Sequence, residues 1–217
     1  MITIQGLYFK YKGEKKYALE DINFKIKDGE FVSIMGANGS GKSTLALCIS
    51  GIYRTTSGII NVDGEDINNS RSAIRRKFGI VFQNPDNQII TNSVERELAF
   101  PLENAGVPLE QMKLIVSKQL KLFNIDKYRT AIPGELSGGE KQKIALASAM
   151  ISSPDYLILD EPTTFLDPFE KREIFNLIKN KFLIKNKFTV ILITQYIREA
   201  LDSDRILVLS DGKLAFD

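Results

Sequence analysis

The stretch "FVSIMGANGSGKSTLALCIS", Phe31 to Ser50, joins a short apolar strand to a glycine-rich loop and a helix. Its centre, residues 36–44, fits the phosphate-binding pattern G-x-x-x-x-G-K-[ST]. In such a loop, glycines let backbone N–H groups close around phosphate oxygens, and the helix N-terminus adds the positive end of its dipole. The candidate binding residues are Gly36, Asn38, Gly39, Ser40, Gly41, Lys42, Ser43 and Thr44.

Two of these side chains have specific expected tasks. Lys42 is expected to reach the β- and γ-phosphates of a nucleoside triphosphate, and Ser43 is expected to give its hydroxyl oxygen to Mg²⁺. The alternative is a Gly-Ser loop that only turns the chain. Its position after a strand and before a helix favours the phosphate site.

A second motif, "YLILDEP", is an apolar strand that ends in Asp160 and Glu161. Ligands gather at the carboxyl ends of parallel strands, and two carboxylates there cost desolvation energy unless a cation or a reacting group is present. We expect Asp160 on the Mg²⁺ side, acting through water, and Glu161 to orient and polarise an attacking water molecule. The alternative is a pair of acids in a helix-capping loop.

The order of strands and helices predicts an α/β fold. In the last third, aliphatic strands such as residues 189–194 alternate with helical segments, which indicates a parallel sheet covered on both faces. The first third reads mainly as strands. Residues 94–123 have helical periodicity, with breaks at Pro101 and Pro108. We predict one domain over residues 1–217, with a helical insert at about 84–134.

The composition excludes several classes of protein. With 43% hydrophobic and 26% charged residues, the chain is an ordinary globular one, and its net charge of +2 argues against a nucleic-acid partner. One cysteine, Cys48, cannot form an internal disulfide and is expected to be a small buried residue. No apolar run reaches the roughly 18–20 residues that span a bilayer, so we expect a soluble chain that reaches a membrane by docking.

The segment "LSGGEKQ", residues 136–142, precedes another helix. Ser137 can cap this helix, while Gly138 and Gly139 leave its first N–H groups uncovered, which predicts a second anion site. One triphosphate has no use for two such sites in one chain. The economical interpretation is that Ser137 and Gly139 approach the γ-phosphate held by another subunit.

With these motifs in this order, nearly the whole chain resembles the ATP-binding subunits of ABC (ATP-binding cassette) proteins. The resemblance implies a P-loop NTPase core with an N-terminal antiparallel β subdomain and an inserted helical subdomain. It also implies head-to-tail dimers that enclose two ATP molecules. Gln83 then senses Mg²⁺ and the attacking water, Asp167 links the two sites across the dimer, and Tyr11 stacks on adenine, with Tyr17 as a competitor.

The segments "VFQNPDNQI" and "SVERELAFPLENAGVP" resemble the energy-coupling-factor (ECF) or cobalt-transport branch of this family, residues 81–89 and 93–108 here. The resemblance implies an ATPase that powers uptake of vitamins or of cobalt and nickel ions through dimer closure and opening. It also places the chain at the cytoplasmic face of the cell membrane. The region Gln83–Gln88 is then a docking surface for membrane subunits; the alternative is a polar loop entering the helical insert.

One residue departs from the family's pattern. Histidine usually follows the strand that reads "VILIT" here, where it contacts the γ-phosphate, but this chain has Gln195 and no histidine. An amide can donate a hydrogen bond but cannot become cationic or shuttle a proton. We therefore expect normal MgATP binding with slow hydrolysis.

Two alternatives stay open at this point. The first is a hydrolytically weak partner that binds nucleotide and lends its 136–142 segment to a sister subunit in a heterodimer. The second is a soluble ABC ATPase that acts on DNA or ribosomes, which the short insert, the single cysteine and the near-neutral charge disfavour.

Overall fold

A central sheet carries the C-terminal part of the chain in this computed structural model, which describes residues 1–164, 166–178 and 188–217. Within those ranges the sheet has six strands in the order β10-β9-β3-β8-β7-β6. The strands from β9 to β6 are parallel, and β10 adds an antiparallel edge. Their bounds are β3 (Phe31–Met35), β6 (Phe78–Val81), β7 (Tyr156–Asp160), β8 (Thr189–Thr194), β9 (Arg205–Ser210) and β10 (Lys213–Phe216).

A second, antiparallel sheet is built from the first third of the chain. In the described residues its order is β2-β1-β4-β5. The bounds are β1 (Ile2–Phe9), β2 (Leu19–Ile26), β4 (Ser57–Val62) and β5 (Glu65–Asp66). Together the two sheets confirm the predicted parallel core with an antiparallel N-terminal part. The edge strand β10 was not predicted.

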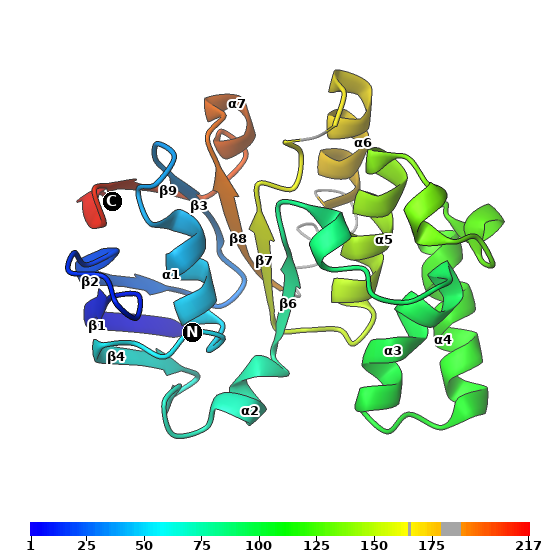
Figure 1. The fold of residues 1–217 in the computed structure, drawn as a ribbon, viewed down its shortest axis with the longest axis horizontal. Coiled ribbons are helices and arrows are strands. Elements are labelled where there is room, and N and C mark those ends of the chain that lie inside the picture. The colour runs from blue at the N-terminus through cyan, green and yellow to red at the C-terminus, as the bar shows by residue number, and fades with distance from the viewer. Residues whose placement is uncertain (165, 179–187) are drawn as a thin grey trace.

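Helices cover both faces of the central sheet, which lies in the middle of the molecule in Figure 1. Helix α1 lies between the two sheets, and α3 to α6 lie on the other side. The helices are α1 (Lys42–Ile49), α2 (Arg71–Arg75), α3 (Val94–Asn104), α4 (Leu109–Leu122), α5 (Gly138–Met150), α6 (Pro168–Ile178) and α7 (Ile197–Ala200). Short 3₁₀ turns occupy Pro85–Asn87, Asp126–Tyr128 and Pro133–Glu135.

The side chains of strand β8 show why both faces of the central sheet are covered. All six of its residues are buried, and because side chains alternate along a strand, they serve two cores. Ile191 and Ile193 pack in the core shared with α1 and the antiparallel sheet, whereas Val190 and Leu192 pack in the core shared with α3, α4 and α5. Cys48 is fully buried in the first core, as expected, and burial raises its pKa to about 12.

Two helices lie in the segment in which an insert was predicted. Residues 84–135 hold α3 and α4 together with the three short 3₁₀ turns. Pro101 lies inside α3 and Pro108 directly precedes α4. One of the helical segments predicted in the last third of the chain is α6, Pro168–Ile178. No helix in the described part of the chain is both long and apolar enough to cross a membrane.

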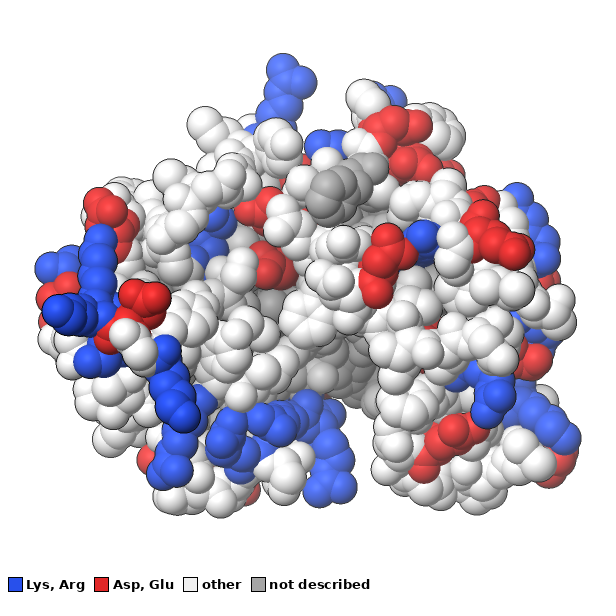
Figure 2. All heavy atoms as spheres, in the orientation of Figure 1, with Lys and Arg blue, Asp and Glu red and all other residues white. Residues whose placement is uncertain are grey.

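The surface carries both signs of charge. Figure 2 shows acidic and basic side chains interspersed over this face, with basic side chains gathered over α2 at its lower edge. Two arginines of this helix are held by the protein itself: Arg71 and Arg75 both donate to the carbonyl oxygen of Gly51, just past the end of α1. They therefore hold the loop that follows α1.

Candidate functional site

The phosphate loop, residues 36–44, runs from the end of β3 to the first turn of α1. A side chain at Gly36 would meet the carbonyl oxygen of Leu209 at 2.3 Å and the hydroxyl oxygen of Ser40 at 2.6 Å. Gly41 has a φ of +101° directly before the helix begins, a conformation that favours glycine. The loop therefore owes its shape to backbone that approaches its neighbours too closely for a side chain.

Lys42 is the cation of this loop, and its side chain is almost fully buried. Its Nζ donates to the carbonyl oxygens of Gly36 and Ala37, at 2.9 Å each, and lies 3.9 Å from Oε1 of Glu161. A buried ammonium is costly unless it is well paired. The amine is thus positioned between the loop and the acid at the end of β7, where an anionic ligand would gain from its charge.

Glu161 follows β7 directly, and its carboxylate is the meeting point of the site. It accepts hydrogen bonds from Nε2 of Gln83 and Oγ1 of Thr164, both at 3.0 Å, and from Nε2 of Gln195 at 2.7 Å. A carboxylate has about four acceptor positions. These three donors, which are all neutral, leave room for one more donor, such as a water molecule.

The backbone of Glu161 is unusual as well. Its φ of +46° lies in the left-handed region, which is strained for a residue with a side chain. Its N–H donates to the carbonyl oxygen of Ile193 in β8 at 2.9 Å. A strained backbone conformation persists only where surrounding contacts fix it. Here the hydrogen bond to β8 and the three donors to the carboxylate fix the conformation of Glu161.

Asp160, the last residue of β7, offers a place for a cation. It is 8% exposed, and its Oδ1 has no hydrogen-bond partner among the described residues. Burial raises the pKa of this carboxyl, which a hydrogen bond from Ser43 offsets in part. A buried carboxylate beside a hydroxyl fits Mg²⁺, which takes few protein ligands and completes its shell with water and substrate phosphates.

A cavity of about 390 Å³ joins these groups. Tyr11 lies at its edge, 40% exposed, with its hydroxyl 2.8 Å from that of Thr44 and its ring edge-on to Phe9 and Tyr53. Tyr17, the competing aromatic, packs against Tyr8 and does not line the cavity. The lining residues are Tyr11, Ala18, Asn38, Gly39, Gly41, Lys42, Ser43, Thr44, Gln83 and Glu161.

The signature segment, residues 136–142, begins helix α5 elsewhere on the molecule. The side chain of Ser137 accepts from the N–H of Glu140 at 3.3 Å, and Glu140 accepts from the N–H of Ser137 at 2.9 Å. This reciprocal pair is a capping box. Ser137 therefore caps the helix as predicted. It lines a separate cavity of about 290 Å³, together with Asp167.

Glu170 of α6 faces the signature segment. A side chain at Gly139 would meet its Oε1 at 2.0 Å, so the carboxylate lies against the backbone of that glycine. Asp167 accepts at Oδ1 from the N–H groups of Phe169 and Glu170, at 2.8 Å each, and so caps the start of α6. An anion of this chain thus occupies the neighbourhood in which a second anion site was predicted.

Comparison with known proteins now decides the family. The sequence profile described as "ABC transporter" matches residues 19–164, which is most of the chain. The chain belongs to the ABC transporter family. The energy-coupling factor transporter ATP-binding protein EcfA1 of Ligilactobacillus salivarius is 45% identical over 218 residues, with 100% of this chain and 77% of that protein covered. The cobalt import ATP-binding protein CbiO of Syntrophus aciditrophicus is 39% identical, with 100% and 78% covered.

Solved structures of ABC proteins agree with this assignment. The cassette MJ0796, in a dimeric post-hydrolysis state bound to ADP and Pi, superposes with a TM-score of 0.90 at 31% identity, with 100% of this chain and 97% of that chain covered. The cbiO1 protein of Clostridium perfringens, described as part of the transporter complex cbiONQ, has a TM-score of 0.88 at 34% identity, with 99% and 86% covered. The predicted fold class and family are confirmed.

The predicted site residues of this ABC chain lie in two separate places. The phosphate loop, Gln83, Asp160, Glu161 and Gln195 lie together, whereas the signature segment and Asp167 share another cavity. The surrounding motifs predict Gln195 beside the γ-phosphate and facing Glu161, and its amide donates to that carboxylate. Thr164 was not predicted as a site residue. Its hydroxyl, three residues after Glu161, could have been recognised from the sequence as a possible donor to that carboxylate.

Proposed function

We propose that the chain binds MgATP at the phosphate loop and hydrolyses it to power an ECF-type importer. The observation that carries this proposal is the carboxylate of Glu161, which accepts from Gln83, Thr164 and Gln195 beside the buried amine of Lys42. A carboxylate held by neutral donors retains basic lone pairs and can accept a proton from water.

Each residue of the site has a part in the reaction. The N–H groups of the phosphate loop and Lys42 hold the phosphates and offset the charge that develops on them. Glu161 orients the attacking water, and Gln83 and Gln195 hold its carboxylate in place. Ser43 and Asp160 would hold Mg²⁺, which supplies charge neutralisation at the phosphates. Tyr11 lines the cavity and is 40% exposed, which supports its role in stacking on adenine.

The second anion site supports a dimer of two such chains or of this chain and a related one. Ser137, which precedes Gly138 and Gly139, lines a cavity apart from the phosphate loop. A signature segment that completes the partner's site accounts for this separation. Asp167 then joins the two sites across the dimer. Because Glu170 lies against Gly139, its carboxylate must move aside when a γ-phosphate arrives.

The membrane partner is proposed to dock at Gln83–Gln88, at the cytoplasmic face of the membrane. Asp86 and Asn87 are exposed, and Ile90 is 68% exposed just beyond. Next to this segment, β6, α3 and α5 enclose a cavity of about 440 Å³, to which Gln88 contributes. In Figure 2 a notch separates the lobe that carries α2 from the lobe of α3 and α4. The EcfA1 name supports an energy-coupling factor transporter, and the CbiO name supports the import of cobalt.

The substitution Glu161→Gln tests the proposal, because it preserves shape and removes the base. ATP turnover of the assembled complex is expected to fall by at least about 100-fold, while ATP binding changes little. Glu110→Gln is the control, since that carboxylate is exposed on α4 and pairs with Lys113. Hydrolysis that survives Glu161→Gln unchanged would overturn the assignment of this residue.

A hydrolytically weak partner in a heterodimer is the second candidate. The observation that favours it is the amide of Gln195, which occupies an acceptor position of Glu161 and carries no charge. Single-turnover hydrolysis confined to the site that contains Gln195 separates the two candidates. Cleavage there supports the ATPase, and its absence supports the weak partner.

A further inference from the structure

A glutamate outside the nucleotide cavity connects the two loops that carry the reacting groups. Glu199 lies in the short helix α7, and its Oε1 accepts from Oγ1 of Thr163 at 2.6 Å. Its Oε2 accepts from Oγ1 of Thr194. We call these contacts the carboxylate bridge. One side chain thus binds both the segment after β7 and the end of β8.

The two hydroxyls of the bridge are deeply buried. Thr163 and Thr194 are each 1% exposed, so neither hydroxyl is well placed to bond with solvent instead. A buried hydroxyl needs a partner, since leaving it unpaired costs its desolvation. The hydroxyl of Thr194 is used twice, because it also accepts from the N–H of Tyr196 at 3.0 Å. Glu199 is therefore the acceptor on which both hydroxyls depend.

Each hydroxyl stands beside a residue of the nucleotide site. Thr163 is two residues after Glu161, and Thr194 directly precedes Gln195. The amide of Gln195 in turn donates to the carboxylate of Glu161 at 2.7 Å. The carboxylate bridge and this hydrogen bond join the same two segments at two points. The bridge therefore limits how far Gln195 can move relative to Glu161.

We infer that Glu199 is a positioning residue for ATP hydrolysis. Through the carboxylate bridge it holds the end of β8 against the segment after β7, so that Gln195 keeps the carboxylate of Glu161 in its reactive orientation. The inference rests on the proposed function. It assigns no contact with nucleotide to Glu199 itself.

A purely local role for Glu199 fits the contacts less well. A glutamate in the first turn of a helix commonly folds back to the N–H of the N-cap residue. Here the N-cap is Tyr196, and its N–H donates to Thr194 instead. The carboxylate of Glu199 reaches across to Thr163, which belongs to another segment of the chain.

The test compares Glu199→Ala with Glu199→Gln in ATP turnover by the assembled complex. The alanine removes both contacts, and kcat is expected to fall about 10- to 100-fold, the cost of a misplaced reacting group, with KM for ATP changed less than about threefold. The glutamine is expected to rescue kcat to within about threefold, because its oxygen can accept from Thr194 while its NH₂ donates to Thr163. Glu110→Ala, at an exposed glutamate of α4, is the control for charge loss alone.

A double-substitution cycle distinguishes positioning from general stability. If Glu199 acts through Gln195, the Glu199→Ala effect on kcat shrinks to less than about threefold in a Gln195→Ala background. A structural role alone makes the two effects multiply. Thr163→Val removes one arm of the bridge with little change in shape, and it repeats the cycle if Glu199→Ala does not fold.

Three outcomes overturn the inference: kcat unchanged in Glu199→Ala and Thr163→Val, multiplied effects in the cycle, or Gln195→Ala without effect on kcat. Glu161→Gln is measured in parallel. If that variant hydrolyses ATP normally, the proposed function fails first. If it is inactive while Glu199→Ala turns over normally, only the positioning role fails.

Discussion

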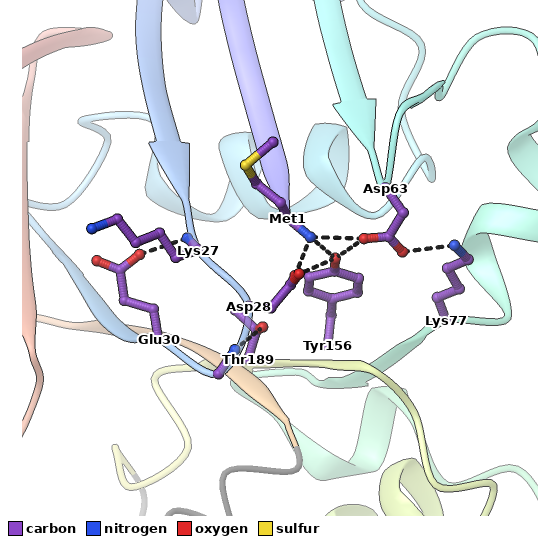
Figure 3. A network of polar contacts seen from close by, with 9 residues as sticks. Met1, Lys27, Asp28, Glu30, Asp63, Lys77, Tyr156 and Thr189 are labelled. Carbon is purple, nitrogen blue, oxygen red and sulfur yellow. Dashed lines mark hydrogen bonds and ion pairs between the residues drawn. The ribbon is translucent and has the colours of Figure 1, made fainter.

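Two carboxylates at opposite ends of strand β7 show how differently this molecule uses an acid. Glu161 follows the last residue of the strand. Asp63, in the turn after β4, contacts Tyr156, the first residue of the strand. Its Oδ1 accepts from the hydroxyl of Tyr156 at 2.5 Å, and its Oδ2 lies 2.6 Å from Nζ of Lys77. The amino group of Met1 contacts Asp63 at 2.7 Å and also contacts Asp28, as Figure 3 shows.

The difference lies in the charge of the donors. Burial alone would raise the pKa of Asp63, but hydrogen bonds from Lys77, the amino terminus and Tyr156 outweigh it and hold the pKa well below its usual range. The donors to Glu161 are neutral, and its carboxylate opens to the 390 Å³ cavity. The first acid joins the antiparallel sheet to the central sheet. The second retains acceptor capacity for a reactant.

The largest effect is expected when the cation beside Glu161 is removed. Lys42→Ala takes away the buried amine that lies 3.9 Å from that carboxylate and leaves the phosphates without their main positive side chain. We expect kcat/KM for ATP to fall by at least about 100-fold, measured as steady-state turnover and nucleotide binding. Lys77→Ala removes the cation at the other acid and is the matched control.

The two lysine variants are expected to differ in ATP turnover. Equal losses of turnover in Lys42→Ala and Lys77→Ala would mean that the Asp63 cluster also governs the reaction. Unchanged ATP binding in Lys42→Ala would contradict the assignment of the phosphate loop itself.

A smaller effect, in the opposite direction, is expected from Gln195→His. Imidazole can still donate to Glu161, and it can also become cationic or carry a proton, which the amide cannot. We expect hydrolysis to become faster by up to about tenfold, read as the single-turnover rate with saturating MgATP. A rate that stays the same or falls would make glutamine a full substitute at this position.

Local motifs made much of the nucleotide site predictable. The phosphate loop and the acid pair each occupy a few consecutive residues, so their spacing carries the chemistry, and the alternation of strands places both at the same edge of the sheet. Gln195 could be singled out because it follows a buried strand. The surrounding motifs also predict that it faces Glu161, but the hydrogen bond between them depends on two loops that fold toward each other.

Contacts between distant segments escaped prediction for the same physical reason. Asp63 and Tyr156 are 93 residues apart, and Thr163 and Glu199 are 36 apart. Neither pair has a sequence pattern: the first contact depends on how the two sheets pack, and the second on how the segments that follow the neighbouring strands β7 and β8 lie against each other. Strand β10 was missed because its residues form an exposed edge, where no buried stripe indicates a strand.

The smallest effect is expected from Asp63→Asn. This substitution should lower the stability of the fold without changing ATP hydrolysis. Asp63 meets Tyr156, four residues or about 13 Å along β7 from Asp160, so ATP turnover should be unchanged. Partly exposed ion pairs contribute about 1 kcal/mol at most, which corresponds to a loss of about 2–4 °C in Tm at pH 7 for a chain of this size.

The Tm difference between the wild-type chain and Asp63→Asn is expected to depend on pH. The pKa of Asp63 is lower in the folded protein than its ordinary value of 3.8. The folded state then binds fewer protons than the unfolded state in the acid range, so the gain in stability is complete above that value and is lost as the pH falls through the folded pKa. The Tm difference between the wild-type chain and Asp63→Asn should therefore be constant from about pH 5 to 7, at least about one unit above the unfolded-state pKa, and should shrink below about pH 4. Thermal unfolding across this range measures it, and a difference that grows in acid would mean that the Asp63 cluster is not held together by the charged carboxylate.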